Sequence, residues 1–269
     1  MEVIYPKPWV LFWFFAACCF MYLAYSLYNM RKGWSRGVKS GSFAKVLRAF
    51  PLKIWVSEVF LQRQLFSLSF PRWMIHQCIF WGFIALTLLT IVSVTLLLLN
   101  LITLDAGLHE FFSQGAGHRL IKIWGDFFGL VLSVGCVGAL ARRFVFRSPQ
   151  IAHDQADTFL SAYLLFMTLS GFMLEGLRMA ASPSDPDRYA FIGRLFMPSQ
   201  FGIVSDTGMW LAWAWIVHAF SGVAILIYLP HSKLLHSLLA PLVIALNASE
   251  EQGRKDMYWP KTKQYRPTK

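Results

Sequence analysis

The chain has 269 residues, of which 56% are hydrophobic and only 14% are charged, against about 25% in an ordinary globular domain. With a mean hydropathy of +0.49, this composition excludes a disordered chain and disfavours a soluble enzyme. The net charge of +11 is also typical of nucleic-acid-binding proteins, so the placement of the basic residues decides how it is interpreted.

Long uncharged runs predict five membrane-spanning helices, because crossing a bilayer of about 30 Å takes about 20 apolar residues in an α-helix. The predicted spans cover about residues 9–30, 73–98, 121–141, 158–179 and 208–230. The first is interpreted as a retained span rather than a cleaved signal, because basic residues follow it and no small-residue cleavage site is present. Residues 1–247 then form one five-helix domain, followed by a basic cytoplasmic tail at 248–269.

The basic residues lie mostly on one side of these spans. The stretches 31–72, 142–147 and 233–269 hold 19 of the 25 Lys and Arg residues. Because cytoplasmic loops of membrane proteins carry the excess of Lys and Arg, the N-terminus is predicted outside and the C-terminus in the cytoplasm, in the cytoplasmic (inner) membrane. This topology, with anionic lipids as partners, accounts for the net charge, and no nucleic-acid partner is predicted.

The cytoplasmic segment 42–72 alternates apolar side chains such as Phe43, Val46 and Phe50 with Lys and Arg. This amphipathic pattern is typical of a segment that lies along the inner leaflet. A docking surface for a cytoplasmic subunit is the alternative interpretation. On the other side of the membrane, residues 182–206 are rich in Pro and Gly and are predicted to form an irregular cap.

Histidines at matched depth indicate the chemistry. His76 lies near the cytoplasmic end of the second span, and His236 lies near the same end of the fifth. Two imidazoles at equal depth on different helices are what a bis-histidine haem requires. His218 and His236 are 18 residues apart, so on an unbroken helix they share one face about 27 Å apart, although Pro230 lies between them. The alternative for each is an interfacial, hydrogen-bonded histidine.

His218 lies in the outer half of the fifth span, where it is a candidate ligand for a second haem. The second span offers Leu86, not a histidine, ten residues after His76. His118, at the outer start of the third span, is the best remaining partner. A five-coordinate haem on His218 alone is the alternative.

Three regions of the sequence together resemble a known family. They contain Arg72–His76 (RWMIH) with Phe80–Phe83 (FWGF), Leu169–Arg178 (LSGFMLEGLR), and His218 followed by Leu229–His236 (LPHSKLLH). In order and spacing they are similar to the nitrate reductase gamma subunit family of five-span b-type cytochromes. Within that family the likeness is to the membrane cytochromes of heterodisulfide-reductase-like and sulfite-reductase-associated complexes, and it covers roughly residues 56–247.

The resemblance implies an outside N-terminus, two haems b across the membrane, and a quinone site beside the outer haem. In the gamma subunits the second span supplies two histidines ten residues apart, and here only His76 is present. Family members place a basic residue near Lys122, which with Glu175 and Arg178 is predicted to bind the head group of menaquinone or another quinone. The alternatives are a snorkelling Lys122 and a surface ion pair between Glu175 and Arg178.

The sequence therefore predicts an all-α integral membrane protein that binds haem b and serves as the cytochrome b subunit of a hetero-oligomeric oxidoreductase of anaerobic respiration. It is expected to transfer electrons between the membrane quinone pool and a cytoplasmic iron–sulfur subunit, in either direction, and to have no substrate-converting domain of its own. The alternative is a haem-free membrane anchor or assembly subunit of such a complex. A secondary transporter is disfavoured because no internal repeat is visible.

Overall fold

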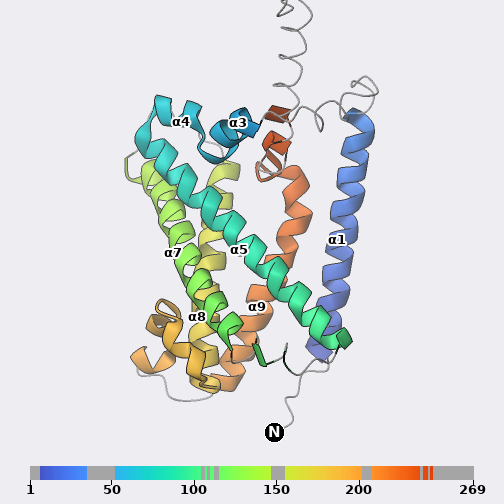
Figure 1. Ribbon diagram of the computed structural model, residues 1–269, viewed down its shortest axis with the longest axis vertical. Helices are drawn as coiled ribbons and strands as arrows, with labels where there is room; N and C mark the ends of the chain where they lie inside the picture. Colours follow the sequence, from blue (N-terminus) through green and yellow to red (C-terminus); the bar gives the residue numbers. More distant parts are fainter. Residues whose placement is uncertain are drawn as a thin grey trace, which may run out of the picture. The chain divides into compact units, whose positions relative to one another are not determined.

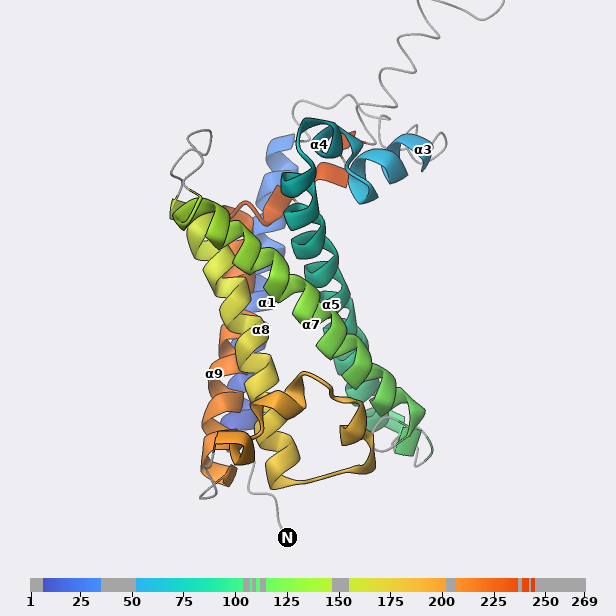
Figure 2. The same ribbon diagram turned by 90° about the vertical axis from the view of Figure 1, so that its left-hand side faces the viewer.

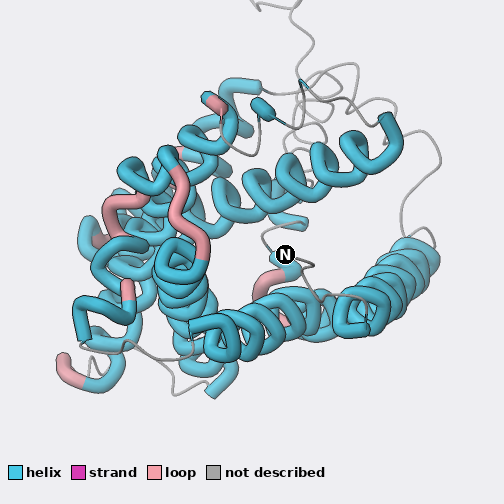
Figure 3. Tube along the Cα trace, turned by 90° about the horizontal axis from the view of Figure 1, so that it is seen from below, coloured by secondary structure: helices cyan, strands magenta, loops and turns pink. Residues whose placement is uncertain are grey.

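The computed structural model describes residues 7–34, 52–103, 107, 110–111, 115–146, 155–201, 207–236, 239–241 and 243–244. These residues form helices and connecting loops, with no strand among them (Figure 3). Five helices are long and apolar enough to cross a membrane. They are α1 (Lys7–Trp34), α5 (Phe70–Thr103), α7 (Ala116–Phe144), α8 (Gln155–Ala181) and α9 (Thr207–Tyr228). The prediction of an all-α, five-span membrane protein is confirmed.

The ends of the long helices follow from local sequence. Pro71 is the second residue of α5, within the first turn, where a helix loses no hydrogen bond to a proline. At the other end of two helices the last turns carry basic residues, Arg31 and Lys32 in α1 and Arg142 and Arg143 in α7. Cations there are favoured by the helix dipole and extend the helices beyond their apolar stretches.

The chain divides into two compact units, residues 1–16 with 71–225 and residues 17–70 with 226–269. In the first unit, α7 packs against α8 (Figure 1). The buried face of α7 is rich in small and polar side chains, as in other membrane helix interfaces, and the facing side of α8 buries residues at four-residue intervals. These positions are Lys122, Asp126, Gly129, Ser133 and Cys136 on α7, and Leu164, Thr168, Phe172 and Gly176 on α8.

The start of α7 and the end of α8 diverge, and the chain after α8 forms three short 3-10 helices, of which the first contacts α7 and the other two contact α8 (Figure 2). They are η2 (Asp185–Tyr189), η3 (Gly193–Phe196) and η4 (Pro198–Phe201). The segment predicted as an irregular cap therefore contains defined 3-10 turns in its described part. Prolines at 186 and 198 fit the start of such turns, because they fix φ near the helical value.

Glycines bring α5 and α7 into close contact. A Cβ atom added to Gly135 of α7 would lie 2.8 Å from both Ile79 Cγ1 and the Ile79 backbone nitrogen of α5. A Cβ atom added to Gly82 of α5 would lie 2.7 Å from Leu132 Cβ of α7. Such distances are shorter than real Cβ contacts, so the backbones approach only because these residues lack a side chain.

We expect Gly135→Ala to lower the stability of the folded chain by about 1–3 kcal/mol, because the added methyl group must push α5 away from α7. Gly125→Ala on the same helix is the matched control, since its Cβ would lie 3.7 Å from Leu89 Cδ2, an ordinary van der Waals distance. Thermal unfolding of the purified protein in detergent measures both variants. Equal melting temperatures for the two would contradict the close approach.

Helices α8 and α9 are joined by a hydrogen bond and by small residues. The Tyr163 hydroxyl of α8 donates to the Ser221 carbonyl of α9. One turn further along α8, Met167 lies against α9, where a Cβ atom added to Gly222 would lie 3.3 Å from Met167 Cε. These contacts fix how α9 lies on α8 at the level of residues 163–171, and so determine which α8 residues meet His218.

In the second unit, short helices precede α5. They are α3 (Leu52–Trp55), the π-helix η1 (Val56–Phe60) and α4 (Arg63–Leu68). Large apolar side chains in this stretch are exposed, with Leu61 at 54%, Phe66 at 51% and Leu68 at 77%. Of the predicted amphipathic segment 42–72, residues 42–51 lie outside the described residues, as does the predicted tail 248–269.

The fifth long helix ends earlier than a continuous helix through His236 requires. Helix α9 ends at Tyr228, the 3-10 helix η5 (Leu229–His231) contains Pro230, and the chain turns at residues 232–234 before helical geometry resumes at Leu235. Proline cannot donate the helical hydrogen bond, which accounts for the break. The prediction that His218 and His236 share one face of an unbroken helix is therefore wrong.

Candidate functional site

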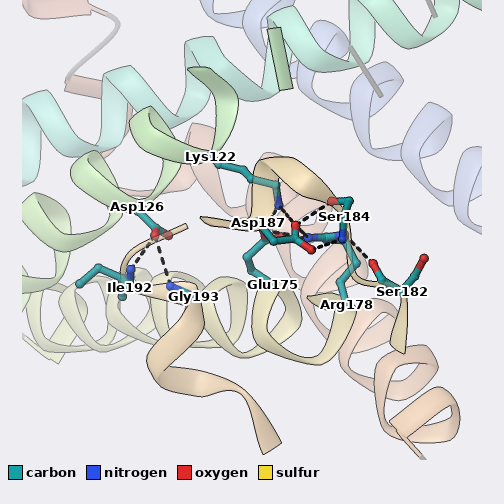
Figure 4. Close-up of polar contacts among 9 residues, drawn as sticks. All are labelled: Lys122, Asp126, Glu175, Arg178, Ser182, Ser184, Asp187, Ile192 and Gly193. Carbon is teal, nitrogen blue, oxygen red and sulfur yellow. Dashed lines mark hydrogen bonds and ion pairs between the residues drawn. The ribbon is translucent and has the colours of Figure 1, made fainter. Parts of the chain in front are cut away.

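A network of four ionised side chains lies where α7 begins and α8 ends (Figure 4). The Lys122 ammonium of α7 contacts a Glu175 carboxylate oxygen of α8 and lies 3.0 Å from Asp187 Oδ1 of η2. The Arg178 guanidinium of α8 pairs with Glu175, with Nε 3.2 Å from Oε2, and also with Asp187. Two cations and two carboxylates thus neutralise one another, and the Lys122 side chain is only 4% exposed.

Asp187 is the centre of this network. Its Oδ1 accepts hydrogen bonds from Arg178 and from the Ser184 hydroxyl at 2.9 Å, and its Oδ2 accepts one from the Ser184 backbone N–H at 2.6 Å. Burial by itself raises the pKa of the carboxyl group. The hydrogen bonds from Ser184, Lys122 and Arg178 outweigh burial and lower the pKa of Asp187 to about 2. Asp187 is therefore ionised throughout the physiological pH range.

Asp126, one turn after Lys122 on α7, holds the following part of the same loop. Its Oδ2 accepts hydrogen bonds from the backbone N–H of Ile192 at 2.6 Å and of Gly193 at 3.3 Å (Figure 4). The loop comes close to α8 at Gly193, where a Cβ atom would lie 2.7 Å from Glu175 Cγ. Lys122 and Asp126 therefore attach the 3-10 loop to α7 at two points.

The structure brings together Lys122, Glu175 and Arg178, the three residues that the sequence predicts at one polar site. The alternative of a snorkelling Lys122 is wrong, because the ammonium is buried against two carboxylates. The ion pair between Glu175 and Arg178 exists, but it is one part of the larger network. Asp187 was missed, although Ser184 followed by an acidic residue three positions later is the pattern of a capped turn.

His218 has a defined hydrogen-bond partner on the neighbouring helix. Its Nδ1 lies 2.9 Å from the Ser170 hydroxyl oxygen of α8, and that hydroxyl also donates to the Met167 carbonyl at 3.1 Å. Because a serine hydroxyl has a single hydrogen, its oxygen accepts the bond from His218. The His218 proton is then on Nδ1, and Nε2 carries the lone pair.

The other histidines of the prediction lie on separate elements. His236, in the second unit, has Nδ1 in contact with the Lys233 carbonyl oxygen. A carbonyl only accepts, so this Nδ1 also carries the proton and Nε2 the lone pair. His76 lies on α5 in the first unit with its ring stacked on Phe80, at 6.5 Å between ring centroids. His118 lies in the first turn of α7, half-buried and one turn before Lys122.

This donor chemistry fits haem iron at two of the predicted positions. A histidine that ligates a metal ion through Nε2 usually donates its Nδ1–H to an acceptor that fixes the tautomer and the ring orientation. His218 does so to a hydroxyl and His236 to a carbonyl. His231 is different, because its Nε2 lies 2.7 Å from the Tyr22 hydroxyl.

Comparisons with known proteins identify the family of the chain. The family model described as nitrate reductase gamma subunit matches residues 72–248. The E subunit of dihydromethanophenazine:CoB–CoM heterodisulfide reductase from Methanosarcina mazei is 24% identical over 204 residues, which are 74% of this chain and 69% of that protein. Its counterpart from Methanosarcina acetivorans is 26% identical over 201 residues, 74% of this chain and 67% of that protein. No solved structure matches the chain.

Proposed function

Because the chain belongs to the nitrate reductase gamma subunit family and is a membrane cytochrome b subunit of a hetero-oligomeric oxidoreductase complex, we propose that it links the membrane quinone pool to a cytoplasmic iron–sulfur subunit. The observation that carries this proposal is the buried Lys122 ammonium held between two carboxylates at one end of the α7–α8 pair. Haem b would carry the electrons between the quinone and the iron–sulfur subunit.

The histidines supply the haem ligands in this proposal. His76 and His236 hold one haem b, and His218 holds a second, with His118 as its candidate partner. Bound haem b supplies reversible one-electron chemistry between its ferric and ferrous states. The Nδ1 hydrogen bonds of His218 and His236 support this assignment, since they leave the lone pair of each imidazole on Nε2, the nitrogen that would bind the iron.

Lys122, Glu175 and Arg178 form the quinol-binding site in this proposal. An ammonium has three N–H donors, and two of those of Lys122 face Glu175 and Asp187. Among the described residues no further acceptor contacts it, so the third donor is available to a quinone oxygen. Glu175 is one-quarter exposed, and its carboxylate is the proton acceptor at this site in the proposal.

The network lies on the outer side in the predicted orientation, so protons leave to the outside and electrons pass inward. The name of the Methanosarcina relatives gives a reduced carrier, dihydromethanophenazine, as the donor to a disulfide. This supports quinol oxidation rather than quinone reduction. The exposed apolar side chains at Leu61, Phe66 and Leu68 support a surface on the cytoplasmic side that meets anionic lipid or the iron–sulfur subunit.

A pyridine haemochrome spectrum of the purified, cofactor-replete complex tests the proposal, and reduced menadione tests the quinol step. We expect the spectrum of haem b and reduction of that haem by the quinol. A complex without Soret absorption would contradict the proposal and would favour the haem-free anchor instead. A haem reduced by dithionite but not by the quinol would contradict the quinone site alone.

A further inference from the structure

Helix α8 presents two adjacent residues to the His218 ring of α9. Ser170 is 7% exposed, and its hydroxyl lies 2.9 Å from His218 Nδ1. At Gly171 a Cβ atom would lie 3.3 Å from His218 Cε1 and 3.9 Å from Nε2. The imidazole therefore lies directly over the glycine, with one ring nitrogen bonded to the preceding serine.

The orientation of the Ser170 hydroxyl determines the proton position on His218. Its Oγ atom also lies 3.1 Å from the Met167 carbonyl oxygen of its own helix, one turn back, in the geometry of a donated hydrogen bond. The hydroxyl oxygen therefore presents a lone pair to the imidazole, and only the tautomer with hydrogen on Nδ1 satisfies both groups. The buried position protects this hydrogen bond from competition by water.

The surrounding contacts keep the two helices in the position that this hydrogen bond needs. Tyr163 bonds the Ser221 carbonyl, and Met167 lies against Gly222, so α8 and α9 are joined on the same side of α8 as Ser170. The His218 ring is confined by Gly171 beneath it and by Ser170 at Nδ1. These two neighbours therefore fix both the rotation and the tautomer of the His218 ring.

We propose that Ser170 is a positioning residue for His218, which fixes the Nδ1–H tautomer and sets the reduction potential of the haem that His218 ligates, while Gly171 supplies the space for the ring. This rests on the proposed function, in which His218 is a haem ligand. Donation of the Nδ1 hydrogen to an acceptor makes Nε2 a stronger electron donor, which favours ferric over ferrous iron. Without that acceptor, the potential rises.

Redox titration of the purified complex, followed at the haem b absorption bands, tests the proposal with Ser170→Ala. We expect the haem to be retained and the midpoint potential of one haem to shift upward. Loss of such a hydrogen bond typically weakens metal binding about tenfold, and a tenfold loss confined to the ferric state corresponds to a rise of about 59 mV. Ser170→Thr keeps the hydroxyl, so its haem is expected to have the same midpoint potential as in the parent protein.

Two matched controls complete the experiment. Ser161→Ala removes another α8 hydroxyl, which donates to the Asp157 carbonyl at 2.9 Å, and should leave the potential unchanged. Gly171→Ala should displace the ring and change the spectrum, whereas Gly222→Ala meets only the flexible Met167 methyl group at the same 3.3 Å and should not. Equal potentials in Ser170→Ala and Ser161→Ala would overturn the role of Ser170.

His218→Ala separates failure of this inference from failure of the proposed function. If His218→Ala removes a haem signal while Ser170→Ala leaves every potential unchanged, His218 is a ligand and Ser170 does not position it. If His218→Ala keeps all haem signals, the assignment of His218 as a ligand is itself wrong, and the role of Ser170 falls with it.

Discussion

Replacement of His76 or His236 by alanine is expected to remove one haem b signal and leave the chain folded. Each residue would supply one nitrogen ligand to the same iron in the proposal, so either substitution removes roughly half of the haem if two are bound. The double variant should lose no more haem than each single variant, because each single substitution already removes the haem that the two residues share. Haem content per protein and the redox-difference spectrum measure the effect.

His231→Ala is the matched control for His236→Ala. The two residues are five positions apart in the same turn region, but His231 Nε2 is occupied by the Tyr22 hydroxyl, whereas His236 donates from Nδ1 to the Lys233 carbonyl. We expect His231→Ala to keep its haem. Equal haem loss in both variants would indicate general damage to this region, and a double variant of His76 and His236 that loses twice as much would place them on different haems.

The five-span architecture was predictable because it depends on hydropathy and length, which each segment carries in its own sequence. Whether His218 and His236 share one helix face was not predictable, because this depends on whether the helix kinks or ends at Pro230. The sequence shows the proline, but a kinked helix and an interrupted helix both accommodate it. The structure interrupts α9 at Tyr228, so the 18-residue spacing loses its geometrical meaning.

The polar site was predictable only in part, for a related reason. Glu175 and Arg178 lie one turn apart on one helix, so their ion pair follows from local spacing. Asp187 joins them only because the loop after α8 folds back through η2, and Ser170 reaches His218 only because α8 and α9 pack at that level. Both contacts depend on tertiary packing, which one sequence does not encode in any short pattern.

The Lys122 ammonium of the ion network is expected to be needed for electron transfer from the quinol to haem. Lys122→Met removes the ammonium while keeping a side chain of similar length, so we expect quinol-driven haem reduction to fall by about 10²-fold or more. Arg178 still contacts both Glu175 and Asp187, but the network is left with one excess negative charge, so we expect the folded variant to be less stable than the parent protein. Reduction by dithionite, which needs no quinone site, should then be unaffected.

The control at Arg188 distinguishes chemistry at the quinone from attachment of the loop. Arg188→Met removes a cation from η2 that forms an exposed pair with Asp185 at 3.4 Å, and it should change quinol-driven reduction little. If Lys122→Met slows quinol and dithionite reduction alike, Lys122 only holds the loop that Asp187 and Asp126 attach to α7 and α8. Selective loss of the quinol reaction assigns the buried ammonium to the quinone, because only that substrate requires a hydrogen-bond donor at this end of the bundle.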